Sequence, residues 1–186
     1  IGLAFENRSA SIVTVSNNNA NHNHAEDVSG NPKTFSAPGE YEYSGVSVKG
    51  VMTPLVDPNS RDERNVAFTI TLDGINICHL GRLSTPLTTN IVDELGPIDV
   101  LLVPVGGNGL LELNGIQQIM QDFDPKIVIP MQYKTQGVQI ELDPVDAFLT
   151  MQSSSELQAQ PRISVTSSNI PPSLSITLLS PQSKVS

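Results

Sequence analysis

The sequence predicts a mixed α/β domain (α/β or α+β class) over residues 1–180, followed by a short tail at 181–186. With 186 residues, the chain is long enough to bury one core without disulfides or metals. Short β-rich runs fill its first half, and helical and strand patterns alternate from about residue 86 onward. Strands followed by alternating helices and strands, within one domain, indicate layered sheet and helix packing.

Five runs in the first half have the apolar, β-branched or alternating character of strands: 11–16, 40–43, 46–53, 66–72 and 75–80. The last two are separated by Asp73-Gly74, a dipeptide that supplies the positive φ angles of a type I′ turn, so they should form a tight hairpin. The proline-rich and polar segment 54–64 is predicted to be an exposed loop.

The second half begins with a helix from Thr88 or Thr89 to Leu95, which Gly96-Pro97 should end. The remaining predicted elements follow in order: a buried strand at 98–105, an amphipathic helix at 112–123, a second buried strand at 126–131, a helix at 144–151, a loop at 152–160, strands at 162–166 and 174–179, and a frayed end at 183–186. Asp143 is expected to cap the third helix, with Pro144 in its first position.

Composition excludes several classes of partner. The net charge is -9 and no stretch gathers Lys and Arg, so a nucleic-acid partner is not expected. No apolar run reaches the 18 residues of a membrane helix, so no membrane partner is expected either. The single cysteine, Cys78, cannot form an internal disulfide, which favours a reducing, cytoplasmic setting. The sequence starts at Ile1 and shows no signal-peptide pattern.

The three histidines limit the chemistry available to the chain. His22 and His24 lie in the Asn-rich segment 17–24 directly after a predicted strand, which is either a ligand-binding cluster or a solvated loop whose side chains satisfy its own turns. His79 at the end of a strand is either a ligand or a hydrogen-bonded structural residue. The neighbouring Cys78 points to the opposite face of that strand, so it cannot pair with His79 as nucleophile and base and is expected in the core.

Several segments, in this order, resemble the metallo-β-lactamase fold superfamily. They are IVTVSNNNANHN at 12–23, PGEYE at 38–42, the strand at 46–53, DGINICHLG at 73–81, DVLLVPVGG at 99–107 and PKIVIPMQYKT at 125–135. Within the superfamily the chain is most similar to the zinc-dependent hydrolases related to ascorbate-6-phosphate lactonase. The resemblance implies an αββα sandwich with metals between its two sheets. The family's first strands are not seen before Ile1, so the fold is expected to be amino-terminally truncated.

The resemblance also shows that the metal motif has changed. Where the family has Ser-His-Asp-His-x-Asp-His, this chain has Asn17, Asn19 and Asn21 in place of two histidines and an aspartate, and retains His22. His-Leu-Gly-Asp has become a motif that keeps His79 but ends in Arg82. The last histidine of Pro-Met-His-Tyr is replaced, so that the segment ends with Gln132 before the tyrosine. These seven residues are the predicted site, a pocket of vestigial metal-ligand positions.

Physical chemistry argues against a metal in this pocket. Catalytic zinc needs about three nitrogen, sulfur or carboxylate ligands, and His22 and His79 are the candidates left, with His24 as a weaker third. A guanidinium about 4 Å from a divalent ion adds roughly 8 kcal/mol of repulsion at an effective dielectric constant of 20. Arg82 therefore opposes metal binding more strongly than the missing ligands do, and no catalytic residue and no cofactor are predicted.

The expected function follows from this loss. The chain is predicted to be a family member that has lost metal-dependent hydrolysis and acts as a binding or structural protein. The alternative is a zinc- or manganese-dependent hydrolase of lactones, esters or phosphoesters with weak activity. The amides, the two histidines and Arg82 suit a small anionic ligand, although Arg82 could instead form a salt bridge or face solvent. Homo-oligomers are frequent in this fold, so self-assembly is a further expectation.

Overall fold

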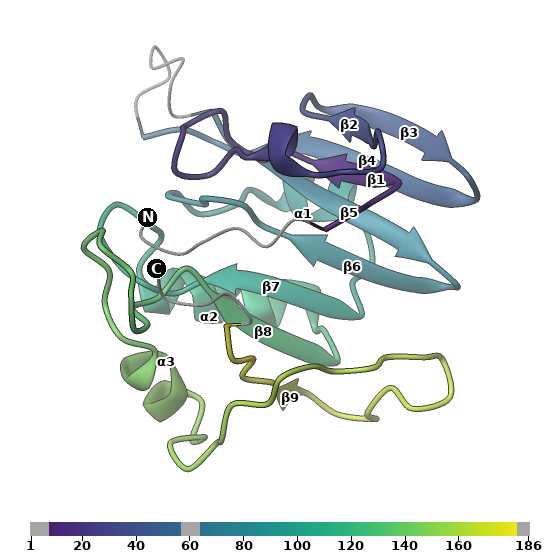
Figure 1. Cartoon of the computed structure of the whole chain (residues 1–186). Helices are drawn as coiled ribbons and strands as arrows, with labels where there is room; N and C mark the ends of the chain where they lie inside the picture. The colour runs from purple at the N-terminus through teal and green to yellow at the C-terminus, as the bar shows by residue number, and fades with distance from the viewer. Residues whose placement is uncertain (1–7, 57–63, 182–186) are drawn as a thin grey trace.

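A seven-stranded sheet forms the centre of the molecule. A computed structural model of the chain describes residues 8–56 and 64–181. The strands are β3 (Gly39–Tyr43), β4 (Val46–Met52), β5 (Val66–Leu72), β6 (Ile75–His79), β7 (Val100–Pro104), β8 (Ile127–Met131) and β9 (Ser175–Ile176), adjacent in this order. The strands from β3 to β6 run antiparallel and those from β6 to β9 run parallel, as Figure 1 shows.

A small parallel pair lies against one face of this sheet, near β3 and β4 (Figure 1). It consists of β1 (Ile12–Thr14) and β2 (Lys33–Phe35), joined through the 3₁₀ turn Ala25–Asp27. Phe35 of this pair packs on Val48 and Phe68 of the large sheet. Within the described ranges, this pair is the only counterpart of the second sheet of the expected sandwich, because all other strands there belong to the large sheet. Neither β2 nor the 3₁₀ turn was predicted.

Helices α1 (Thr89–Leu95) and α2 (Leu113–Phe123) cover the opposite face of the large sheet (Figure 1). Ile116, Ile119, Met120 and Phe123 are the buried residues of α2, as the predicted spacing of three and four residues requires. They pack with strand residues such as Leu101 into the largest core of the molecule, to which α3 (Asp146–Met151) adds Phe148. None of the helices within the described residues has the length and apolar character of a membrane span.

The predicted hairpin is confirmed. Leu72 of β5 is paired with Ile75 of β6, which leaves Asp73 and Gly74 as the two turn residues. Their φ values of 51° and 78° are those of a type I′ turn, whose twist matches that of the flanking strands. The hairpin therefore fixes the register between β5 and β6, and β6 is the strand at which the sheet changes from antiparallel to parallel.

Three predictions in the second half were wrong in detail. Residues 162–166 form no strand, and the strand expected at 174–179 is reduced to the two residues of β9. Asp143 does not cap α3: the N-cap is Val145, and the Asp143 N–H donates to the Gly106 carbonyl at 2.7 Å. Residues 57–63 of the predicted loop and 182–186 of the predicted tail lie outside the described residues.

The parallel strands determine where a site can form. Because β6, β7 and β8 run in one direction, their carboxyl ends meet at one edge of the sheet, and the loops that follow them lie together there (Figure 1). The loop after β1 lies at the same end of the molecule. Ligand sites of open α/β sheets form at such edges.

Candidate functional site

A cavity of about 920 Å³ opens at this edge of the sheet. Six of the seven predicted site residues line it: Asn17, Asn19, Asn21, His22, Arg82 and Gln132. They come from three loops, which follow β1, β6 and β8. The volume lies in the upper part of the range of small-molecule pockets. Residues separated by more than 100 positions in the sequence thus share one cavity.

The Asn-rich loop is built by its own side chains. The Asn17 Oδ1 accepts the Asn19 N–H at 2.7 Å, and the Asn19 Oδ1 accepts the Asn21 N–H at 2.9 Å. Asn17 is buried, and its Nδ2 donates to the Arg64 carbonyl at 2.8 Å. The interpretation as a self-satisfied turn is therefore correct for Asn17, which holds the loop in place. The amide Nδ2 groups of Asn19 and Asn21, both exposed residues, donate no hydrogen bond to another described residue.

Arg82, Gln132 and His22 add further donors to those of the Asn-rich loop. The Arg82 guanidinium has one long hydrogen bond, from its Nη2 to the Asn108 carbonyl at 3.5 Å, and forms no ion pair with a described carboxylate. Neither the Gln132 amide nor the His22 imidazole is hydrogen bonded to any residue in the described ranges. Burial and, to a lesser degree, the positive charge of Arg82 lower the pKa of His22. Among the described residues that line it, the cavity thus gathers one permanent cation, several neutral donors and one exposed carboxylate, that of Glu141.

Arg82 is positioned by a residue that the sequence analysis missed. The buried Asn65 accepts the Arg82 backbone N–H with its Oδ1 at 2.7 Å. Its Nδ2 donates to the Leu80 carbonyl at 2.9 Å and to the Thr53 hydroxyl at 3.1 Å. Gly81 has a φ of 64°, and a Cβ there would overlap the Asn65 side chain, so this turn requires glycine. The signal that the sequence offered for this role was a polar residue, Asn65, directly before the apolar strand β5.

Gln132 has an unusual backbone for a residue that is not glycine. Its φ is 53°, directly after β8. A Cβ on Gly106 would collide with the Gln132 carbonyl, so the loops after β7 and β8 approach each other closely. Non-glycine residues in this region of φ cost free energy and gather at functional sites. The conformation is consistent with a site at this edge.

The other two histidines are placed differently from the rest of the predicted site. His79 is not among the residues that line the cavity, and its Nδ1 accepts the Gly81 N–H at 3.0 Å. Burial lowers its pKa to about 4, so the imidazole is neutral at pH 7. His24 pairs with Asp27 at 3.5 Å on the exposed 3₁₀ turn. Cys78 is fully buried in the helix-side core, and burial raises the pKa of its thiol to about 12, as expected of a core residue.

The side chains of the described residues do not fit a catalytic metal. Among residues 8–56 and 64–181, no three His, Cys, Asp or Glu side chains lie close enough together to hold a metal ion. Of the three histidines, only His22 is among the residues that line the cavity, and it shares the cavity with a guanidinium. Amide oxygens are weak substitutes for imidazole as zinc ligands. We therefore derive no metal-dependent step for this cavity.

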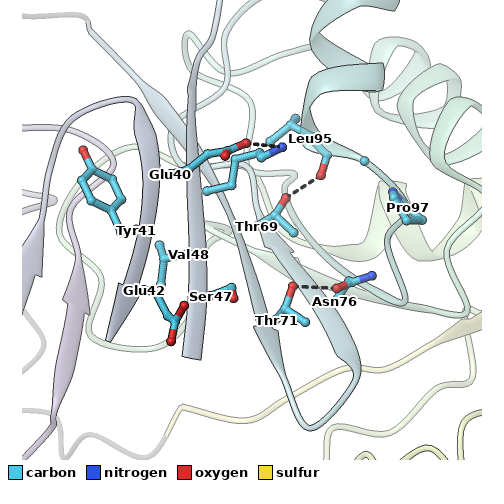
Figure 2. A pocket seen from close by; sticks show the side chains of 12 residues that line it. Glu40, Tyr41, Glu42, Ser47, Val48, Thr69, Thr71, Asn76, Leu95 and Pro97 are labelled. Atoms are coloured by element: carbon cyan, nitrogen blue, oxygen red, sulfur yellow. Dashed lines mark hydrogen bonds and ion pairs between the residues drawn. The ribbon is translucent and has the colours of Figure 1, made fainter. Parts of the chain in front are cut away.

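A second hollow, of about 610 Å³, lies over β3, β4 and β5 beside the end of α1 (Figure 2). Lys49 and Glu40 form an ion pair there at 2.9 Å, and the Thr71 hydroxyl donates to the Asn76 Oδ1 at 2.8 Å. The Thr69 hydroxyl donates to the Leu95 carbonyl at 3.1 Å. No predicted site residue lines this groove.

Fold and site together define the class of the protein. The sequence profile described as β-lactamase superfamily domain matches residues 1–132. The chain therefore belongs to the β-lactamase superfamily, as the resemblance implied. The profile ends at Gln132, so it includes the predicted site residues, whereas the cavity-lining residues from Tyr133 to Pro181 lie beyond the matched region.

Individual relatives agree with this assignment. The chain is similar to the structure of a proposed zinc-dependent hydrolase of the metallo-β-lactamase superfamily from Thermotoga maritima, with 33% identity and a TM-score of 0.75, over 94% of this chain and 84% of that one. It is 29% identical over 104 residues to a metal-dependent hydrolase of Carboxydothermus hydrogenoformans, which is 52% of this chain and 45% of that protein. It is 32% identical over 79 residues to a metal-dependent hydrolase of Archaeoglobus fulgidus, which is 42% and 34% of the two chains. The matches thus span less than half the length of these two curated relatives.

Proposed function

We propose that this chain binds a small anion in the cavity lined by Arg82 and that metal-dependent hydrolysis has been lost. One observation carries the proposal: Arg82 occupies the position where the resemblance expects a metal-bridging carboxylate, and its guanidinium lines the same cavity as His22 and Gln132. A guanidinium binds phosphate and carboxylate groups through two parallel hydrogen bonds and repels cations. The preference of the cavity would then have changed from cation to anion.

The state of the polar groups supports this proposal. The Arg82 guanidinium has no described carboxylate partner, and its bond to the Asn108 carbonyl is long. Asn65 fixes the backbone of Arg82, which limits the entropy lost when an anion binds. The net charge of -9 opposes an anion at long range, but salt screens this repulsion beyond about 8 Å.

A second candidate is a metal-dependent hydrolase with weak activity on a lactone, ester or phosphoester. It is favoured by the relatives from Carboxydothermus hydrogenoformans and Archaeoglobus fulgidus, which are named metal-dependent hydrolases. For this chain it would require a metal held chiefly by His22, against the charge of Arg82. Zinc binding separates this candidate from the first.

Calorimetric titration with inorganic phosphate tests the proposal. Wild type should bind phosphate, and Arg82→Ala should bind it about tenfold or more weakly, since hydrogen bonds to charged groups contribute about 1.5 to 3 kcal/mol. The matched control is Lys49→Ala, which removes a cation from the groove beside α1 and should leave phosphate binding unchanged.

A wild type that binds zinc but not phosphate would reverse the order of the two candidates. Equal phosphate affinity in wild type and Arg82→Ala would exclude the proposed site.

A further inference from the structure

The cavity has an apolar part in addition to its polar residues. Leu102 of β7 and Ile129 of β8 are paired across the two strands, lie on the same face of the sheet and both line the cavity. Leu110 and Leu179, which follow β7 and β9, line it too. An inorganic phosphate ion has no apolar group that could pack on this surface. The cavity is therefore more apolar than a site for inorganic anions requires.

The loop at 134–143 completes this apolar lining. The Lys134 Nζ donates to the carbonyls of Val138 at 2.6 Å and Ile140 at 3.3 Å, and the Asn108 Nδ2 donates to the Glu141 carbonyl at 2.6 Å. These bonds occupy backbone carbonyls of the loop, and both Val138 and Ile140 line the cavity. These hydrogen bonds hold the loop against the cavity.

Two backbone hydrogen bonds anchor this loop at its end. The Lys134 N–H donates to the Asp143 carbonyl at 2.9 Å, and the Asp143 N–H donates to the Gly106 carbonyl at 2.7 Å. A Cβ on Gly107 would collide with the Asp143 carboxylate, so the loop after β7 has to be small where the two loops meet. A pre-formed wall loses little conformational entropy when a ligand binds.

Resting on the proposed function, we infer that the ligand is an amphipathic anion, a charged group carried on an aliphatic chain. Arg82 binds the anionic group, and the chain lies against the wall formed by Leu102, Ile129 and Ile140. The volume of about 920 Å³ is larger than an inorganic anion needs and suits a drug-sized ligand. Val138, Ile140 and Leu142 are only partly buried, so covering them removes apolar surface from water.

Titrations with inorganic phosphate, n-butyl phosphate and n-hexyl phosphate test this inference. Each buried methylene contributes about 0.8 kcal/mol, so affinity should rise about three- to fourfold per added methylene. Ile140→Ser should reduce the ratio of the affinities for n-hexyl phosphate and inorganic phosphate. Leu72→Ser is the control, because Leu72 is 45% exposed and does not line the cavity.

The outcomes separate this inference from the proposed function. If inorganic and hexyl phosphate bind equally well, the inference is wrong and the proposed function stands. If neither binds, the proposed function fails, and the inference fails with it. If hexyl phosphate binds equally well to wild type and Ile140→Ser, the chain does not lie on this wall and the inference is wrong.

An exposed carboxylate, Glu141, also lines the cavity and provides a further check. Because exposed charge pairs interact weakly in water, Glu141→Gln should tighten hexyl phosphate binding less than about threefold. A gain above about tenfold would place the anionic group beside Glu141 instead of Arg82 and would overturn the assignment.

Discussion

The two hollows of this molecule differ in how far their polar side chains are paired with one another. In the groove over β3, β4 and β5, polar groups of neighbouring strands bond to one another, as Lys49 does with Glu40 and Thr71 with Asn76 (Figure 2). In the cavity at the carboxyl ends of β6 and β8, Arg82 and Gln132 lie on loops after strands, and their side chains have few or no hydrogen-bond partners among the described residues. Strand pairing brings side chains into register with each other, whereas loops hold them apart. Free donors are therefore found at the strand ends.

The largest expected effect concerns the residue that supports the cavity. Asn65→Ala removes three side-chain hydrogen bonds and leaves the Arg82 N–H and the Leu80 carbonyl without this partner. Each buried polar group left unsatisfied costs about 1 to 3 kcal/mol, so unfolding free energy should fall by about 3 to 5 kcal/mol. Urea unfolding measures this loss. A loss below about 1 kcal/mol would show that the Arg82 turn does not depend on Asn65.

The next effect is a pH dependence of stability. Burial lowers the pKa of His79 to about 4, while the unfolded chain takes up this proton near the ordinary value of 6.5. Between these values the unfolded state binds more protons, so stability falls as pH drops from 6.5 towards 4. Between pH 7 and pH 5 the loss from His79 should be about 2 kcal/mol. The lowered pKa of His22 acts in the same direction.

Urea unfolding of wild type and His79→Gln at pH 7 and pH 5 measures the contribution of His79. The variant should lose clearly less stability than wild type over this interval, whatever its absolute stability. Equal losses in both proteins would mean that His79 titrates alike in the folded and unfolded states.

A conservative change at Arg82 gives an effect of intermediate size. Arg82→Lys keeps the charge but loses the planar fork that binds an oxyanion through two bonds. Phosphate should bind about three- to tenfold more weakly than to wild type, and still more tightly than to Arg82→Ala. Calorimetry measures the series. Identical affinities for Arg82→Lys and wild type would show that charge alone holds the anion.

The smallest effect is expected in the groove beside α1. Thr71→Val removes the hydrogen bond to Asn76, which is only partly buried, so water can replace the lost partner. The unfolding free energy should change by less than about 1 kcal/mol, and phosphate affinity should not change. A change in phosphate affinity would show that the two hollows are coupled.

The elements that could be predicted from the sequence are those with strong local signals. The Asp73-Gly74 hairpin and α2 were both predicted and are confirmed, since turn residues and helical spacing act over a few positions. The strand β2 and the absence of a strand at 162–166 depend on distant partners, which no local pattern reveals. Asp143 was expected to cap α3, but tertiary contacts with Gly106 direct its backbone elsewhere.

The site could be predicted in part for a similar reason. The resemblance aligned three loops, and the structure places Asn19, His22, Arg82 and Gln132 around one cavity. The supporting role of Asn65 and the wall built on Lys134 rest on hydrogen bonds between loops, which spacing does not show. His79 shares its strand end with the site but does not line the cavity, because its ring turns to the Gly81 N–H.

Metal content tests most directly whether this cavity has exchanged metal binding for anion binding. The full chain, purified without added metal or chelator, would be analysed for zinc, manganese and iron by elemental mass spectrometry and then titrated with zinc in a calorimeter. Because Arg82 lies in a cavity without three ligating side chains among the described residues, we expect far less than one metal per chain and no saturable zinc binding. Near-stoichiometric metal in the purified protein would contradict the claim that metal binding has been lost. Saturable zinc binding by wild type that Arg82→Ala strengthens only slightly would contradict it as well.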